Sequence, residues 1–218
     1  MVLIASLDSL DGGMDQQIGG KAANLGRLIT GGFRVPPGVV VTVDVYEHYL
    51  ERTGIRSRIG KVLSSIDFED EASLERASEK IRAFFVSGTE DGVAEALDRA
   101  IEEIDPHALW SVRSSAVAED LASASFAGQQ DTYLNVRRAE VMANVRRCWA
   151  SYWNSRAITY RHQAGVDQLG TGMAVVVQRM ADTTGTPIIL TGLTERTAAS
   201  IIFMRRPPRP PALGSLAA

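Results

Sequence analysis

The 218-residue sequence contains a single cysteine, Cys148, so no disulfide can form within the chain. It also lacks an excess of basic residues, because 23 Lys and Arg stand against 26 Asp and Glu, for a formal net charge of -3. A chain without an overall positive field is not expected to bind nucleic acid through bulk electrostatics. Any anion-binding site in this protein must therefore be local.

Membrane and export signals are absent as well. The sequence shows neither a signal-peptide pattern at Met1 nor an apolar run long enough to span a membrane. We therefore expect no membrane partner and, by default, a cytoplasmic location. The apolar content of 45% is enough to bury a core of ordinary size, in one domain or in two small ones. Cys148 lies at helical spacing from Val145 and Tyr152, which favours a buried, inert thiol.

Both helices and strands are predicted from the apolar periodicity. Amphipathic helices are expected around 22–29, 45–50, 74–85 and 93–104, and one long helix over 138–161. Short apolar runs bounded by turn residues predict strands, and glycines with Asp15 predict a turn or loop over 8–17. The expected strands cover 2–7, 34–42, 110–113, 132–136 and 172–180.

A short motif near the N-terminus points to phosphate. Gly19 and Gly20 precede Lys21 at the predicted start of a helix. Glycines let the backbone approach a ligand closely, the N–H groups of a first helical turn lack intrahelical partners, and the lysine adds a mobile positive charge. An ordinary glycine turn before a helix is the alternative, since short Gly-Lys matches arise by chance. A Walker A loop is excluded, because Asp15 stands at its first glycine and Ala22 follows the lysine.

A second anion-binding element is predicted between Trp110 and Val136. An apolar strand there ends in Arg113 and two serines, and a loop of small residues then leads through Gly128 into another strand. An arginine offers a planar fork to a phosphate, and a glycine allows close backbone approach. A further polar residue, Gln178, ends the apolar strand 172–180, and strand ends are where open α/β sheets present groups to ligands.

Several of these segments, taken in order, resemble the ATP-binding domain that phosphoenolpyruvate synthase shares with pyruvate phosphate dikinase and rifampin phosphotransferase. The resemblance runs from about Leu7 to Met180. The motifs that carry it are Ile18-Gly-Gly-Lys-Ala-Ala-Asn-Leu-Gly-Arg-Leu28, Arg34-Val-Pro-Pro-Gly38, Val112-Arg-Ser-Ser-Ala116, Ala118-Glu-Asp120, Ser125–Val136, Ser155–Arg161 and Val175–Met180.

This resemblance implies an α+β fold, part of an ATP-grasp-like nucleotide-binding domain in which ATP lies between two small subdomains. It also implies that Lys21 and Arg113 hold the phosphates of ATP. The loop before the Thr-Tyr-Leu-Asn run would contact the nucleotide through Gly128 and Thr132, and Gln178 would face it from its strand end.

Four more residues are predicted to support that loop: Ser114, Glu119, Asp120 and Gln129. The carboxylates of Glu119 and Asp120 would orient the arginine loop or approach a metal ion. The alternative is that they only cap or solvate the loop.

Other parts of the family's machinery are not found in the sequence. Mg²⁺ is expected for the family, but the half of the ATP domain that carries its ligands is missing, so the metal site is unknown. The histidines His48, His107 and His162 do not occur in the family's Thr-Ser-His context and are interpreted as structural or surface residues. We therefore assign no catalytic residue to this chain.

The expected domain organisation is an ATP-binding domain over 1–182 and a divergent tail over 183–218. Residues 183–218 contain five prolines and four arginines but a single acidic residue, Glu195, and this composition predicts a partly disordered tail. Our hypothesis for this change in composition is a truncated or frameshifted product.

Three functions remain open at this point. The first is the ATP-binding portion of a phosphoenolpyruvate-synthase-type phosphotransferase, which moves phosphate from ATP through a histidine to pyruvate. The second is the same portion of an antibiotic phosphotransferase of the rifamycin type. The third is a nucleotide-binding remnant without activity of its own. ATP is the expected ligand in all three, and the acceptor would bind only through domains that this chain lacks.

Overall fold

The computed structural model describes residues 4–10, 13–86, 92–116, 131–170 and 172–181. Gly128, Glu119, Asp120 and Gln129 lie outside these ranges. The described residues up to Met180 belong to one compact unit. In chain order its elements are β1 (Ile4–Ser6), the 3-10 helix η1 (Leu7–Ser9), α1 (Asp15–Thr30), β2 (Gly38–Val41), α2 (Val43–Arg52), α3 (Ile55–Leu63), α4 (Glu71–Val86), α5 (Val93–Ile104), β3 (Trp110–Ala116), β4 (Thr132–Val136), the 3-10 helix η3 (Arg138–Glu140), α6 (Val141–Ser151), α7 (Ser155–Gln163) and β5 (Met173–Arg179).

One sheet organises this unit. Its strand order is β1-β2-β5-β3-β4, and every neighbouring pair is antiparallel. The central strand β5 is buried from Met173 to Gln178, which explains why its sequence is an unbroken apolar run rather than an alternating one. The mixture of helices with an antiparallel sheet confirms the predicted α+β class. The finer prediction, two subdomains of an ATP-grasp-like domain, stays a prediction.

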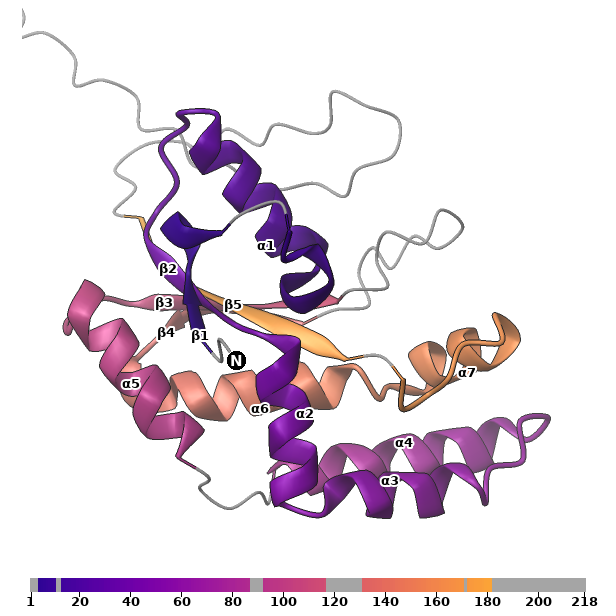
Figure 1. The fold of residues 1–218 in the computed structure, drawn as a ribbon. Helices are drawn as coiled ribbons and strands as arrows, with labels where there is room; N and C mark the ends of the chain where they lie inside the picture. Colours follow the sequence, from indigo (N-terminus) through magenta and orange to yellow (C-terminus); the bar gives the residue numbers. More distant parts are fainter. Residues whose placement is uncertain (1–3, 11–12, 87–91, 117–130, 171, 182–218) are drawn as a thin grey trace, which may run out of the picture. The chain divides into compact units, whose positions relative to one another are not determined.

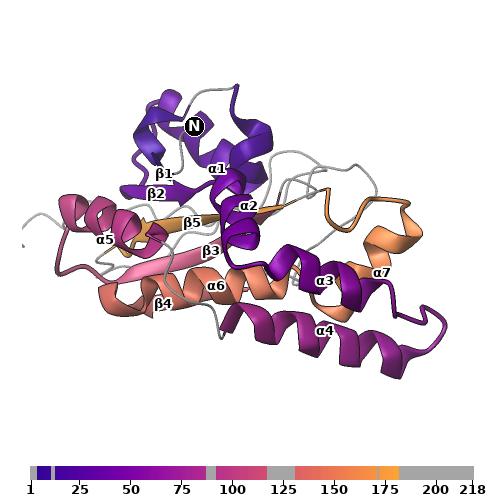
Figure 2. The ribbon, with the colours of Figure 1, turned by 60° about the horizontal axis from the view of Figure 1, so that its bottom comes forward.

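The sheet has a hydrophobic core on each face. On one face Ile18, Ala22 and Leu25 of α1 pack against Val40 and Val176. On the other face the core is larger, with buried side chains from α2 to α6. Figures 1 and 2 show these helices on the opposite side of the sheet from α1. Side chains alternate between the two faces along a strand, so odd and even positions of β5 serve different cores. We call the side covered by α1 the α1 face.

Aromatic side chains fill the centre of the larger core. Tyr46 stacks with Phe85 and meets Trp149 edge-on, with ring centroids 6.2 and 5.8 Å apart. The indole Nε1 of Trp153 donates a hydrogen bond of 2.9 Å to the Tyr46 hydroxyl. Complete burial raises the pKa of Tyr46, so the phenol stays neutral and serves as an acceptor. Cys148 is buried in the same core, as predicted.

The long helix predicted over 138–161 is wrong in one respect, because the chain breaks it between α6 and α7. Asn154 causes the break. Its side-chain oxygen accepts from the Ala157 amide at 2.7 Å, and its amide group donates to the Ser151 carbonyl at 2.9 Å. An asparagine that satisfies the first turn of a new helix ends the old one, and the apolar periodicity of the two helices concealed the change.

Two other local predictions need correction. The segment 8–17 is not simply a turn, since η1 reaches Ser9 and α1 begins at Asp15. Helix α3 was not predicted, although Ile55, Ile59 and Val62 are buried at helical spacing.

Candidate functional site

Helix α1 is kinked at Gly19, two residues before Lys21. Gly19 has φ 71° and ψ 168°, a backbone conformation that only glycine adopts readily. A Cβ atom on Gly19 would lie 2.3 Å from the carbonyl oxygen of Ser115 in β3. The glycine therefore serves a close approach between α1 and β3. The glycine pair predicts a close approach to a ligand here, whereas the structure shows a close approach to the protein's own strand.

The hydroxyl of Ser115 takes the place of a helix hydrogen bond at this kink. In a regular helix the Ala22 amide would donate to the Ile18 carbonyl, four residues earlier. Here the Ala22 amide donates to Ser115 Oγ at 3.2 Å, and Ser115 Oγ donates to the Ile18 carbonyl at 2.8 Å. An inserted side chain of this kind is a recognised cause of a sharp kink. The first-turn amide of Ala22 is thus satisfied within the protein, contrary to the expectation that these groups lack partners.

Arg113 lies two residues before Ser115, so both side chains belong to the same face of β3. That face is the α1 face, because Arg113 pairs with Val176, a member of the α1 core. The half-buried Arg113 donates from Nη1 to the side-chain oxygen of Gln178 at 3.5 Å, which is the long limit for such a bond. Gln178 in turn donates from Nε2 to the carbonyl oxygen of Pro36 at 2.8 Å.

Strand β4 places Thr132 beside the arginine. Thr132 pairs directly with Arg113, and residues directly opposite one another in an antiparallel pair point to the same face. Thr132 is exposed. The α1 face therefore carries an arginine fork and a hydroxyl side by side on neighbouring strands.

Ser114 points to the opposite face from Arg113. Its hydroxyl and its amide both donate to the carbonyl oxygen of Asp131, at 3.3 and 3.4 Å, and the Cys148 thiol approaches the same oxygen at 3.9 Å. Asp131 directly precedes Thr132. Ser114 thus fixes the start of β4, and its support of the loop before β4 stays a prediction.

The charge of Lys21 reaches the same end of β3. Burial raises the pKa of the Cys148 thiol, the carboxylate of Asp131 adds to the rise, and the ammonium of Lys21 acts in the opposite direction. Electrostatic influence of this kind falls off with distance. Lys21 is half-buried and stands next to Ala22, whose amide is bonded to β3. The α1 face therefore receives one cation from α1 and one from β3.

Four of the predicted ATP-binding residues thus belong to one region. Lys21, Arg113, Thr132 and Gln178 all come from α1 or from the α1 face of the sheet. Gly128, Glu119, Asp120 and Gln129 lie outside the described residues.

The sequence analysis missed Ser115. Alternation along the strand held the necessary signal, since Ser115 and not Ser114 shares the face of Arg113. The structure adds that Ser115 also bonds to α1.

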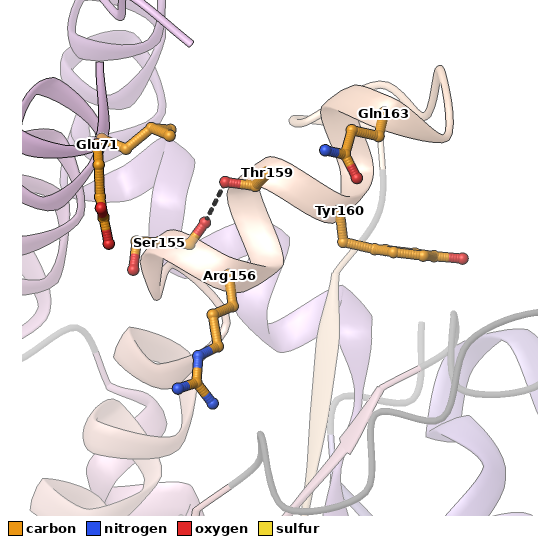
Figure 3. A pocket seen from close by; sticks show the side chains of 7 residues that line it. Glu71, Ser155, Arg156, Thr159, Tyr160 and Gln163 are labelled. Carbon is orange, nitrogen blue, oxygen red and sulfur yellow. Dashed lines mark hydrogen bonds between the residues drawn. The ribbon is translucent and has the colours of Figure 1, made fainter. Parts of the chain in front are cut away.

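A cavity of about 340 Å³ opens elsewhere, between α4 and α7. Figure 3 shows its polar side chains, and within it Thr159 Oγ1 donates to the carbonyl oxygen of Ser155 at 2.9 Å. None of the predicted ATP-binding residues lines this cavity. Its lining residues are Glu71, Leu74, Ser155, Arg156, Thr159, Tyr160 and Gln163.

The described residues contain no group of three or more His, Cys, Asp or Glu side chains that could hold a metal ion. The histidines are dispersed: His48 is half-buried, His107 is exposed, and His162 stacks on Phe68 with ring centroids 3.5 Å apart. In the described part of the chain, every helix is too short or too polar to cross a membrane.

Comparison with known proteins gives a consistent match. The family described as "Pyruvate phosphate dikinase, AMP/ATP-binding domain" matches residues 15–205, beyond the last of the motifs quoted above. A probable phosphoenolpyruvate synthase of Methanocaldococcus jannaschii is 42% identical over 189 residues, which cover 84% of this chain and 16% of the relative. The phosphoenolpyruvate synthase of Aquifex aeolicus is 40% identical over 173 residues, covering 74% of this chain and 20% of the relative.

A relative of a second kind is the rifampicin phosphotransferase of Streptomyces sviceus. It is 39% identical over 180 residues, which cover 81% of this chain and 21% of the relative. The chain therefore spans about a fifth of the length of these relatives.

Proposed function

Because the chain belongs to the family of the pyruvate phosphate dikinase AMP/ATP-binding domain, we propose that it binds ATP as the ATP-binding portion of a phosphotransferase of the phosphoenolpyruvate synthase type. The observation that carries this proposal is the pair of hydrogen bonds that join the backbone around Lys21 in α1 to β3, the strand that contains Arg113. Ser115 bonds to the backbone on both sides of Lys21, and Arg113 lies two residues from Ser115 on the same face.

The chemistry of this pair suits a polyphosphate. The guanidinium of Arg113 offers parallel N–H donors to phosphate oxygens, and Lys21 offers a point charge. Phosphoryl transfer depends on positioning and on neutralisation of charge, so cations fixed with respect to each other are what it needs from a protein. Thr132 adds a hydroxyl on the strand next to Arg113. Gln178 lies on the other side of Arg113, where it holds the arginine or faces the nucleotide.

We place the phosphates of ATP on the α1 face of the sheet, beside the C-terminal part of β3. In an ATP-grasp-like arrangement this face forms one wall of the nucleotide site. The resemblance adds contacts from Gly128, with Gln129, Glu119 and Asp120 as support for its loop. Mg²⁺ neutralises phosphate charge when it is bound in such enzymes, but the described residues provide no cluster of ligands for it. The assignments of this paragraph concern binding alone.

Pyruvate, reached through a phosphorylated histidine, is our first candidate for the final acceptor. An antibiotic of the rifamycin type is the second, because a rifampicin phosphotransferase is about as similar to this chain as the synthases are, with 39% identity against 40 and 42%. Both kinds of relative share this segment, so their difference in acceptor must arise elsewhere. A third candidate is a nucleotide-binding module that performs no transfer.

Titration calorimetry with ATP, with and without Mg²⁺, tests the binding proposal. Lys21→Ala and Arg113→Ala should each weaken binding about tenfold or more, the loss expected for a charge-assisted contact of about 1.5–3 kcal/mol. Lys61→Ala in α3 and Arg82→Ala in α4 are matched controls, because both cations are exposed and lie on the far side of the larger core. Equal affinity in all four variants would refute the site.

Turnover by the 218-residue chain would exclude the third candidate, whereas its absence is expected under all three. We expect this chain by itself to bind ATP without turnover, since the predicted acceptor histidine is not among its three. Incubation with γ-labelled ATP, followed by analysis of free phosphate and of protein-bound label, measures this. Robust hydrolysis or labelling of the chain would contradict the prediction and favour a complete catalytic unit.

A further inference from the structure

Ser115 occupies an unusual position between two elements that carry the proposed ATP contacts. It is fully buried in β3, and its hydroxyl makes two hydrogen bonds to α1. The acceptor of one bond is the Ile18 carbonyl, and the donor of the other is the Ala22 amide. Ile18 and Ala22 bracket Lys21, so Ser115 holds both ends of the turn from which the lysine projects.

The packing of α1 against β3 is very close at this contact. Gly19 approaches Ser115 so closely that a Cβ atom would lie 2.3 Å from its carbonyl oxygen and 2.8 Å from its hydroxyl. Real Cβ atoms do not come this near to other heavy atoms, so the absence of a side chain at position 19 is what permits the contact. The backbones of α1 and β3 therefore approach closely where Gly19 meets Ser115. Gly19 lies two residues from Lys21, and Ser115 lies two residues from Arg113.

We propose that Ser115 is the positioning residue for Lys21: its hydroxyl replaces the missing helix bond between Ala22 and Ile18 and thereby fixes the lysine turn against the strand of Arg113. This inference rests on the proposed function, because it concerns the same ATP site. Ser115 does not touch the nucleotide. It sets the separation and direction of the two cations that do.

Substitution of the hydroxyl should therefore weaken ATP binding without removing any group that contacts ATP. Ser115→Ala leaves the Ile18 carbonyl and the Ala22 amide without their partner, which frees the turn to reorient. We expect the dissociation constant for ATP to rise about 3- to 10-fold, the range that corresponds to one lost hydrogen bond. Amide exchange at Ala22 should accelerate in the same variant even without ATP.

A double-mutant cycle distinguishes positioning of Lys21 from a general loss of stability. Ser115→Ala is measured by ATP calorimetry in the wild type and again in the Lys21→Ala background. If Ser115 acts through the lysine, its effect should fall below about 2-fold once the lysine is gone, because interacting residues are not additive. Ser151→Ala is the control, since that buried hydroxyl donates to the Cys148 carbonyl within α6 and does not contact α1.

The outcomes are separable. If the wild type binds ATP and Lys21→Ala weakens binding, but Ser115→Ala has no effect or the same effect in both backgrounds, the positioning role is wrong and the ATP site stands. If the wild type does not bind ATP, or Lys21→Ala binds as tightly as the wild type, the proposed function fails and this inference fails with it. Should Ser115→Ala not fold, Ser115→Cys takes its place in the cycle, because a thiol keeps the shape of the side chain and bonds much more weakly.

Discussion

The side-chain amide of Gln178 donates a hydrogen bond of 2.8 Å to the carbonyl oxygen of Pro36, 142 residues earlier in the chain. Its oxygen accepts from Arg113 at 3.5 Å. One buried amide thus joins the Val-Pro-Pro-Gly segment before β2 to the arginine of β3. Gln178 is only 6% exposed, so water hardly reaches its side-chain amide. The two bonds give a protein partner to both the oxygen and the nitrogen of this amide. The geometry favours a role in holding Arg113, beside any contact with nucleotide.

Gln178→Glu should weaken ATP binding more than Gln178→Ala. The glutamate has nearly the same shape but loses the donor to Pro36, and it places a negative charge beside Arg113, where it competes with phosphate. We expect about a tenfold rise in the dissociation constant for Gln178→Glu, or about 1.4 kcal/mol, and a smaller rise for Gln178→Ala.

Titration calorimetry at two salt concentrations measures the difference, because an effect of charge shrinks as salt increases. Gln163→Glu in α7 is the control, since that glutamine is exposed and lines the separate cavity between α4 and α7. An equal, salt-independent loss in the alanine and glutamate variants of Gln178 would rule out the electrostatic explanation.

Gly19→Ala should destabilise the protein strongly. The substitution forces a side chain into a conformation reserved for glycine and against the carbonyl oxygen of Ser115, 2.3 Å from the new Cβ. We expect a loss of about 3 kcal/mol in the free energy of unfolding, measured by urea denaturation. Gly32→Ala is the matched control: Gly32 follows the same helix with φ 80°, but no atom lies within 4 Å of a Cβ there.

The control separates backbone strain from the collision. Strain of a left-handed residue alone costs about 1–2 kcal/mol, so Gly32→Ala should show that and no more. If both variants lose the same stability, the close contact with Ser115 contributes nothing. ATP affinity should fall in Gly19→Ala alone, since only this glycine borders the turn of Lys21.

The sequence singles out candidate residues for the site but not the contacts between them. Lys21 and Arg113 stand out because glycines beside a lysine, and an arginine at a strand end, are residue types with a chemical use. The hydrogen bonds by which Ser115 joins α1 to β3 did not stand out. A serine is compatible with many environments. Alternation along β3 puts Ser115 on the face of Arg113, but only the register of β3 against β5 reveals that α1 covers this face.

For the fold as well, the sequence indicated local elements better than features that depend on distant contacts. The unbroken apolar run of β5 identified a buried strand. The α+β class was implied by the resemblance to the ATP-binding domain family rather than by these patterns. The break at Asn154 was hidden because apolar residues continue at helical spacing on both sides of it. Helix α3 was hidden for the opposite reason, since Gly54 and Gly60 flank and interrupt a short amphipathic pattern whose burial depends on partners distant in sequence.

Tyr46→Phe should be destabilising although it removes only one oxygen. The Tyr46 hydroxyl accepts from Trp153 Nε1 at 2.9 Å in a core from which water is excluded, so its removal leaves a buried donor without a partner. We expect a loss of about 1–3 kcal/mol in the free energy of unfolding. Trp153→Phe adds a loss of packing, but the double variant should cost about 1 kcal/mol less than the sum of the two, since no donor is then left unsatisfied. Strict additivity in urea denaturation would show that the bond contributes little.

The ion cluster of Arg138 predicts a dependence of stability on pH. Arg138 donates to both carboxylate oxygens of Asp98 in α5, at 2.6 and 2.5 Å, and pairs with Glu102 at 2.9 Å. The hydrogen bonds from Arg138 lower the pKa of Asp98 below its ordinary value of 3.8. A carboxyl group with a lowered pKa stabilises the folded state above the pKa of the unfolded chain, and this contribution is lost as pH falls through the folded value.

Asp98→Asn should therefore lower the melting temperature at neutral pH, and the difference from the wild type should shrink as the pH drops below about 4. The effect should be small and should weaken with salt, because Asp98 remains half exposed in the folded protein. Glu103→Gln in the same helix is the control, because Glu103 is exposed and is not one of the carboxylates paired with Arg138. Calorimetric melting between pH 3 and 7 provides the comparison. A difference that persists unchanged at pH 3 would mean that the asparagine perturbs α5 itself, since the contribution of the wild-type carboxylate declines once the pH falls below the pKa of the unfolded chain.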